Sequence, residues 1–292
     1  MSQLSILEQL CYSTTRIETK DKSGNLYSGT GFFFNIKNDN EVLPLLITNK
    51  HVVKNMEEGV FRLTEADADG QPITTKHFPV VFDKKFHDNW IMHPEEDVDL
   101  CAYPLLPLLG FMGHSGPNVF FRTFDSSLIP NSKQIEELDA VEDIIMVGYP
   151  NGLWDSVNNM PLVRRGITAS HYKYDYNGKK EFVIDAACFP GSSGSPVLIC
   201  NVGSYRDKFG NFMFGNSRIL LLGILYAGPQ LTVSGDIKVV TVPDAQQKAL
   251  SISHIPNNLG YIIKSEKIMD FLPLFIKLRD KFKVPIFTAI KP

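Results

Sequence analysis

The chain has 292 residues, and its 29 basic and 32 acidic side chains give a net charge of −3. This near balance provides no strongly basic surface, so neither nucleic acid nor an anionic membrane is expected as a partner. The hydrophobic share of 43% is ordinary for a folded globular domain. No apolar run reaches the ~18 residues that a membrane-spanning helix needs.

Short apolar segments separated by turn residues predict a first half built mainly of strands. Leucines at helical spacing predict a short amphipathic helix over 3–11. The strands expected after it cover residues 14–18, 29–35, 43–48, 60–64, 78–82 and 100–104. Segments 107–127 and 131–142 contain Gly, Pro or polar residues and are expected to be connections, the second being the junction between two halves.

The second half shows the same patterning. Its expected strands cover residues 144–148, 161–169, 181–186, 196–200, 219–226 and 237–242. Residues 201–217, rich in Gly, Asn and charge, are expected to form a hairpin excursion. Apolar residues at helical spacing over 265–281 predict a closing helix with Ser265 as its N-cap, and Pro273 is expected to kink or break it. The pattern predicts an all-β protein with a C-terminal helix.

The most informative motif is a serine enclosed by glycines, G-S-S-G-S-P at positions 191–196. A serine hydroxyl becomes a useful nucleophile where the backbone bends tightly and presents it beside an oxyanion hole. Gly191 and Gly194 permit such a bend, and the N–H groups of Gly191 and Ser193 are expected to point at one small volume. The alternative is an ordinary Gly/Ser turn that leads into the next strand.

A nucleophilic serine needs a general base and a group that fixes the tautomer of that base. His51 follows directly on the apolar segment 43–48, and a histidine just past a buried strand end can turn into a cleft. The other six histidines lie in polar or mixed segments. His51 is therefore the candidate base.

An acidic cluster that runs into segment 100–104 supplies two candidates for the orienting carboxylate. Asp99 is the last carboxylate before the apolar run, where it can accept the imidazole N–H of His51 and stay ionised. Asp97 is the competitor, because it lies two residues earlier and therefore on the same strand face. We favour Asp99, since an orienting carboxylate is expected at the point where the strand becomes buried. The alternative is that both are solvated loop acids.

The order His51, Asp99, Ser193 and the sequences around these residues resemble those of chymotrypsin-like serine peptidases. T-N-K-H at 48–51 resembles the T-A-A-H box, D-L-C-A at 99–102 the D-[IL]-A-[LV] box, and the serine loop the G-[DN]-S-G-G-P box. Within the family, the stretch D-A-A-C-F-P-G-S-S that ends at Ser193 is most similar to the bacterial Deg, or high-temperature-requirement, branch. The likeness covers roughly residues 10–275.

The resemblance implies two six-stranded antiparallel β-barrels with the active site between them, 1–135 carrying His51 and Asp99 and 136–292 carrying Ser193. It implies a serine endopeptidase that cleaves a protein or peptide substrate through a covalent acyl-enzyme, with no cofactor and no metal ion. A catalytically weak or inactive peptide-binding module on the same fold is the alternative. No PDZ domain is expected, because only about 17 residues follow position 275 and a domain needs at least ~50.

Alignment to the serine motif also implies a first specificity pocket. Ala187 is expected at its base, with Tyr226, Ala227 and Gly228 forming a wall. Because none of these residues is an acid, we expect cleavage after small or apolar residues rather than after Lys or Arg. Asp185 is the one acid close enough in sequence to change this expectation.

Other residues near the motif bear on selectivity and control. Arg164 and Arg165 are a possible site for an acidic substrate group, although paired arginines are more often solvated. Ser192 stands where mammalian digestive members of the family carry the aspartate that captures a newly cut N-terminus, so activation by N-terminal processing is not expected. No propeptide or sensor segment is apparent in the sequence, which leaves a regulatory partner open.

Cysteine usage and the N-terminal segment predict the compartment. The cysteines have neither paired spacing nor a metal-type C-x-x-C, so free thiols and a reducing environment are expected. They are Cys11, Cys101, Cys188 and Cys200. Segment 1–15 has Glu8 within its apolar stretch and lacks a basic start and a small-residue cleavage site, which makes it a poor signal peptide. These features predict a cytoplasmic location, and the resemblance to the Deg branch implies a bacterial-type protease.

Overall fold

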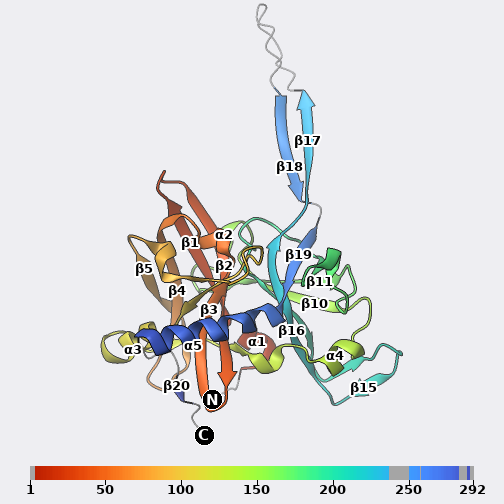
Figure 1. Cartoon of the computed structure of the whole chain (residues 1–292), viewed down its shortest axis with the longest axis horizontal. Helices are drawn as coiled ribbons and strands as arrows, with labels where there is room; N and C mark the ends of the chain where they lie inside the picture. The colour runs from red at the N-terminus through yellow and green to blue at the C-terminus, as the bar shows by residue number, and fades with distance from the viewer. Residues whose placement is uncertain (1–3, 237–249, 257, 283–287, 290–292) are drawn as a thin grey trace, which may run out of the picture.

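The computed structural model describes residues 4–236, 250–256, 258–282 and 288–289. Strands dominate and fall into two groups, one from each half of the chain, with a helix lying across them (Figure 1). The all-β, two-part architecture expected from the resemblance to chymotrypsin-like peptidases is confirmed.

The first half forms one mainly antiparallel sheet in the order β5-β4-β1-β2-β3-β7-β6. Its main strands are β1 (Thr14–Asp21), β2 (Leu26–Asn38), β3 (Glu41–Thr48), β4 (Met56–Ala66), β5 (Pro72–Phe82), β6 (Ile91–Met92) and β7 (Cys101–Pro104). The short strands that attach to it are β8 (Val119–Phe120), β9 (Phe124–Asp125) and β20 (Thr288–Ala289). All six strands predicted for this half are present. Most are longer than their apolar runs, because sheet pairing also satisfies the backbone of polar residues at strand ends.

The second half forms a closed barrel in the order β10-β11-β12-β19-β16-β13. Its strands are β10 (Asp143–Gly148), β11 (Leu162–Thr168), β12 (Glu181–Asp185), β13 (Pro196–Asn201), β16 (Arg218–Ala227) and β19 (Leu259–Lys264). The sequence pattern placed the sixth strand at 237–242, which lies outside the described residues; in the structure β19 completes the barrel.

Two hairpins extend from the second half. The excursion predicted over 201–217 is present as β14 (Ser204–Arg206) paired with β15 (Phe212–Phe214). A second pair, β17 (Gln230–Asp236) and β18 (Leu250–Pro256), projects from the body of the molecule (Figure 1). The sequence pattern missed this pair, because its Ser- and Thr-containing segments lack the continuous apolar run of the barrel strands.

Helices account for most departures from the expected connections. The α-helices are α1 (Ile6–Leu10), α2 (Lys50–Val53), α3 (Leu106–Ser115), α4 (Ser132–Glu137) and α5 (Phe271–Phe282). The 3₁₀ helices are η1 (Phe86–Asn89), η2 (Ser126–Leu128), η3 (Pro150–Gly152), η4 (Tyr176–Gly178) and η5 (Ser265–Asp270). Helices α3 and α4 lie in segments expected to be connections. Helix α4 forms there because the side chains of Asn131 and Gln134 make a reciprocal capping box at its start.

The predicted C-terminal helix has a different beginning. Residues 265–270 form η5, and the α-helix begins only at Phe271, so Ser265 is not its N-cap. Pro273 therefore lies in the first turn of α5, where the missing N–H has no helical partner to lose. The expected kink or break is present as a change of helix type between Asp270 and Phe271, two residues before the proline, rather than as an interruption at Pro273 itself.

Helix α5 fastens the two halves together. One continuous apolar core contains Phe32 and Leu45 from the first half, Val147 and Leu221 from the second, and Phe271 of α5, all buried. Figure 1 shows α5 crossing in front of both groups of strands. The two halves and α5 thus share one packed apolar core, which resists relative movement of the parts.

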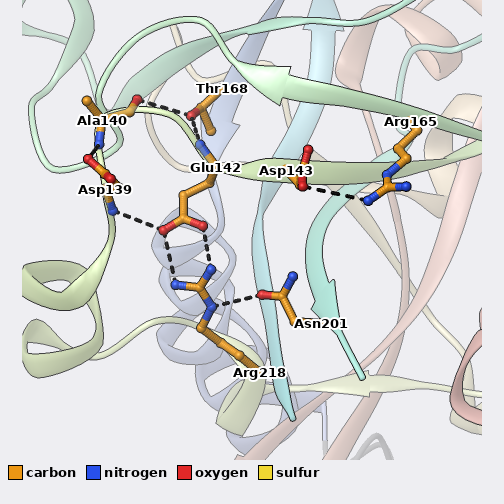
Figure 2. Close-up of polar contacts among 8 residues, drawn as sticks. All are labelled: Asp139, Ala140, Glu142, Asp143, Arg165, Thr168, Asn201 and Arg218. Atoms are coloured by element: carbon orange, nitrogen blue, oxygen red, sulfur yellow. Dashed lines mark hydrogen bonds and ion pairs between the residues drawn. The ribbon is translucent and has the colours of Figure 1, made fainter. Parts of the chain in front are cut away.

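A second link joins the inter-half connection to the barrel (Figure 2). The guanidinium of Arg218 on β16 makes two contacts with the Glu142 carboxylate, of which Nη1–Oε1 measures 3.0 Å. The Arg218 Nε donates to Asn201 Oδ1 at 3.0 Å, and Asp139 N–H donates to Glu142 Oε1 at 2.9 Å. The Glu142 N–H donates to the Thr168 hydroxyl on β11 at 2.9 Å. Both charges are almost fully buried and well satisfied by hydrogen bonds.

Replacing Arg218 with Met should lower the free energy of unfolding by about 3 kcal/mol, because it leaves the Glu142 carboxylate buried without its counter-charge. Arg165→Met is the matched control, since Arg165 pairs with Asp143 on the surface at 3.6 Å (Figure 2) and its side chain is 78% exposed. We expect the control to stay within about 0.5 kcal/mol of wild type. Urea unfolding of the two variants measures the difference, and equal losses would contradict a structural role for the buried pair.

Candidate active site

His51 and Asp99 are in direct contact at the end of β3. His51 is the second residue of α2, which follows β3 after Asn49. Its Nδ1 is 2.5 Å from Asp99 Oδ2. The backbone N–H of His51 donates to Asp99 Oδ1 at 3.1 Å. An ionised carboxylate only accepts hydrogen bonds, so this arrangement places the ring proton on Nδ1 and leaves Nε2 able to accept one. The His51 side chain is 49% exposed.

Neighbouring groups fix the loop that carries Asp99. The side-chain amide of Asn49 donates to the Asp99 carbonyl at 2.7 Å, and Lys50 Nζ donates to the Glu95 carbonyl at 2.8 Å. Asp97 is exposed and makes no side-chain hydrogen bond or ion pair with any described residue. The geometry therefore favours Asp99 over Asp97 as the partner of His51.

The Ser193 loop is seated on the first half of the molecule. Gly194 has φ +89°, and a Cβ at this position would lie 1.9 Å from the Thr30 carbonyl oxygen and 2.6 Å from Thr48 Oγ1. The Thr30 N–H donates to the Ser193 carbonyl at 2.8 Å. Because Thr48 precedes His51 by three residues, this contact brings the serine loop to the strand end that presents the histidine. The Ser193 and His51 side chains are not hydrogen-bonded to each other in the structure.

A turn beside the loop orients the peptide bond between Pro190 and Gly191. The Pro190 carbonyl accepts a hydrogen bond from the Asn151 N–H at 2.5 Å. Carbonyl and N–H point in opposite directions across a trans peptide, so the Gly191 N–H faces away from Asn151. Gly191 has φ +83°, and a Cβ there would meet the Tyr149 carbonyl oxygen at 2.6 Å. Asn151 itself adopts φ +51°.

The next peptide is oriented in the same manner. The Ser192 carbonyl accepts from the Ser195 N–H at 3.0 Å, which turns the N–H of Ser193 the other way. Neither the Gly191 N–H nor the Ser193 N–H donates to any described residue. The serine loop therefore contains two backbone donors, at Gly191 and Ser193, that have no partner among the described residues.

A pocket of about 300 Å³ opens beside Ser193. Its lining residues are Cys188, Phe189, Pro190, Ser193, Leu225, Ala227, Gly228 and Pro229. None of these residues is charged.

The pocket includes some of the residues expected from the sequence and omits others. Ala227 and Gly228 line it, whereas Tyr226 points to the other side of β16 and its hydroxyl donates to Glu181 Oε2 at 2.9 Å. Ala187 is not part of the lining, and its carbonyl accepts from Arg164. Asp185 is exposed at the end of β12 and does not line the pocket either.

The four cysteines are free, as expected from their spacing. Cys188 lies in the pocket wall, where burial raises the pKa of its thiol to about 11. This thiol is therefore protonated at neutral pH and a poor nucleophile. In the described part of the chain there is no group of three or more His, Cys, Asp or Glu residues arranged to hold a metal ion. No helix among the described residues is long and apolar enough to span a membrane.

Two features of this site are not predictable from local sequence. The N–H of Asn151, 42 residues before Ser193, donates to the Pro190 carbonyl, and Arg164 reaches the serine loop from β11. A proline-asparagine-glycine turn signals a tight bend, but its partner depends on how the barrel folds.

Comparisons with known proteins agree with this geometry. Residues 29–202 match the trypsin-like peptidase domain family, a span that contains His51, Asp99 and Ser193. A comparison with curated protein sequences gives no match.

Similar solved structures are distant in sequence. The active form of the Rv3671c protease from M. tuberculosis is 16% identical, with 91% of this chain and 82% of that chain covered and a TM-score of 0.41. A serine endoprotease from Yersinia pestis is 13% identical over 94% of this chain and 68% of the other, with a TM-score of 0.42. The protease Anisep from Arthrobacter nicotinovorans is 11% identical over 87% and 90%, with a TM-score of 0.40. At these scores the likenesses add nothing to the argument from the site.

The family match covers more than half of the chain and includes the whole serine loop. This protein belongs to the trypsin-like peptidase domain family.

Proposed function

We propose that this protein is a serine endopeptidase in which Ser193, His51 and Asp99 form the catalytic triad. The observation that carries the proposal is the pair of free N–H groups, from Gly191 and Ser193, beside a hydroxyl whose loop packs against the strand end before His51. Preorganised donors of this kind supply a large part of the rate enhancement in acyl transfer. They also argue against an inactive binding module, in which the oxyanion loop has no need to keep both donors free.

In the proposed reaction, the Ser193 hydroxyl attacks the scissile carbonyl carbon while His51 Nε2 accepts its proton. Asp99 holds the imidazole in the required tautomer and stabilises the imidazolium that forms. The N–H groups of Gly191 and Ser193 bind the oxyanion of the tetrahedral intermediate. His51 then protonates the leaving amine, and a water molecule hydrolyses the acyl-enzyme by the same proton path.

The serine assignment is favoured over a cysteine mechanism by the electrostatics of Cys188. Because burial raises the pKa of this thiol to about 11, almost none of it is thiolate at neutral pH. A thiol nucleophile is activated by the opposite shift.

The apolar pocket next to Ser193 supports cleavage after small or apolar residues. A lysine or arginine side chain entering it would lose hydration and find no acid among the lining residues. The free cysteines support a reducing, cytoplasmic location for this activity.

Replacing Ser193 with Ala should reduce hydrolysis of fluorescein-labelled casein at least about 10⁴-fold and abolish labelling by a fluorophosphonate probe. Ser156→Ala is the matched control, since it makes the same chemical change at an exposed serine outside the serine loop. The control should be labelled like wild type. Labelling of the Ser193→Ala protein would refute the assignment of the nucleophile.

Asp99→Asn should lower kcat by about 10⁴-fold, because an amide favours the wrong imidazole tautomer. Asp97→Asn makes the same chemical change two residues earlier, on an exposed side chain. We expect it to change kcat by less than about twofold. Steady-state kinetics of the two variants on one peptide substrate distinguishes them. If Asp97→Asn were the more damaging change, the triad acid would be misassigned.

A matched set of peptide anilides that differ only in the residue before the scissile bond tests the pocket. We expect kcat/KM for Ala, Val or Leu to exceed that for Lys or Arg at least about tenfold. Efficient cleavage restricted to the Lys and Arg peptides would contradict the pocket assignment.

A further inference from the structure

Arg164 reaches the serine loop from a strand of the second barrel. It lies on β11, and its Nη1 donates both to the Ala187 carbonyl and to the Ser192 hydroxyl, the latter at 3.0 Å. Ser192 is completely buried. One guanidinium nitrogen thus ties together the two ends of segment 187–192, which precedes the nucleophile.

The Ala187 carbonyl and the Ser192 hydroxyl, which Arg164 contacts, lie next to both backbone donors of the serine loop. Between the carbonyl and the hydroxyl is the bend through Pro190 and Gly191, which carries one of the two free N–H groups. The peptide bond between Ser192 and Ser193 follows directly and carries the second free N–H group, that of Ser193. A shift of the Ser192 side chain would turn this peptide and with it the Ser193 N–H, whose direction determines its use as a donor.

The remaining guanidinium nitrogens of Arg164 show that its charge is poorly compensated. Nε and Nη2 are buried and have no hydrogen-bond partner among the described residues. No described Asp or Glu forms an ion pair with Arg164, and burial lowers the pKa of its guanidinium. An uncompensated buried cation costs stability. Stability of the fold therefore does not explain a charge at this position. The contacts of Arg164 with the serine loop explain it better.

We propose that Arg164 is a positioning residue that acts through Ser192 to hold the oxyanion loop with its N–H groups aimed at the reacting carbonyl. This inference rests on the proposed peptidase function. It assigns no contact between Arg164 and the substrate: Arg164 does not line the pocket, and its free nitrogens have no exposed surface.

Arg164→Met is the direct test, because Met keeps an unbranched apolar side chain and removes the charge and the donors. Arg165→Met makes the identical change at the next residue, where the side chain faces solvent and pairs with Asp143 (Figure 2). The probes are a fluorophosphonate, for the rate and final extent of Ser193 labelling, and a peptide anilide with Ala before the scissile bond, for kcat and KM.

We expect Arg164→Met to lower the labelling rate and kcat by about 10- to 100-fold, less than the roughly 10²–10³ that follows complete loss of an oxyanion donor. KM, the final extent of labelling and the midpoint of thermal unfolding should stay close to wild type, and Arg165→Met should match wild type throughout. Arg164→Lys should restore part of kcat, because it keeps one charged donor.

Three results would overturn the inference. They are an unchanged kcat in Arg164→Met, a loss confined to KM, and a lower final extent of labelling that accounts for the whole loss of rate. A loss confined to KM would make Arg164 a pocket residue, and incomplete labelling would make it a structural one.

The route through Ser192 is tested by a double-mutant cycle. If Arg164 acts through the Ser192 hydroxyl, Arg164→Met in a Ser192→Ala background should lower kcat by clearly less than it does alone. Full additivity would contradict that route. Ser193→Ala, assayed in parallel, separates the two proposals: labelling without Ser193 removes the peptidase proposal itself, whereas normal labelling of Arg164→Met alone removes only the role of Arg164.

Discussion

The serine loop is held by backbone and hydroxyl groups of Thr30, a buried residue from the opposite half of the chain. The Thr30 N–H donates to the Ser193 carbonyl, and its hydroxyl donates to the Gly191 carbonyl at 3.0 Å while accepting from the Tyr149 N–H at 3.2 Å. The Thr30 carbonyl in turn accepts from Thr48 Oγ1 at 2.7 Å. One residue of β2 thus sets the position of the serine loop relative to the strand that leads to His51.

The close contact between Thr30 and the serine loop explains why the loop needs its glycines. Gly194 packs so closely on the Thr30 carbonyl that any side chain would force the two halves apart. Gly191 adopts a left-handed conformation that β-carbon residues rarely take, and it lies against the backbone of η3. In the proposed mechanism these contacts determine the direction of two N–H groups before any substrate arrives. Donors fixed in advance need no reorganisation during the reaction, which is the physical basis of their effect on rate.

The sequence predicts those parts of the site that depend on local chemistry. A tight Gly/Ser turn, a histidine at the end of an apolar strand and a carboxylate at the start of another are each visible in the chain, and the contact between His51 and Asp99 lies where their order suggests. What holds the loop in place depends on contacts between distant segments. The Asn151 N–H and the Arg164 guanidinium reach the serine loop only after the barrel has closed, and a local pattern contains no sign of such pairings.

The fold, like the site, is predictable from the sequence only where local patterns determine it. Apolar runs locate most of the buried barrel strands, because burial on one or both faces requires them, but they do not identify β19 as the strand that completes the second barrel. They miss α3 and α4, which form where local capping and helical spacing compete with turn-rich composition, and they miss the projecting pair β17 and β18. Tyr226 shows the effect at a single residue: alternation along β16 turns its side chain away from the pocket that its neighbour Ala227 lines.

The pocket and the support of the serine loop rest on different residues. The pocket wall beside Ser193 carries no acid that would attract a basic side chain. The Arg164 guanidinium is not among the lining residues, and it contacts the Ala187 carbonyl and the Ser192 hydroxyl of the serine loop instead. In the proposed reaction the two features therefore act on different parts of the chemistry: the pocket disfavours lysine and arginine because it offers no acid to a desolvated cation, whereas Arg164 holds the loop that carries the oxyanion donors.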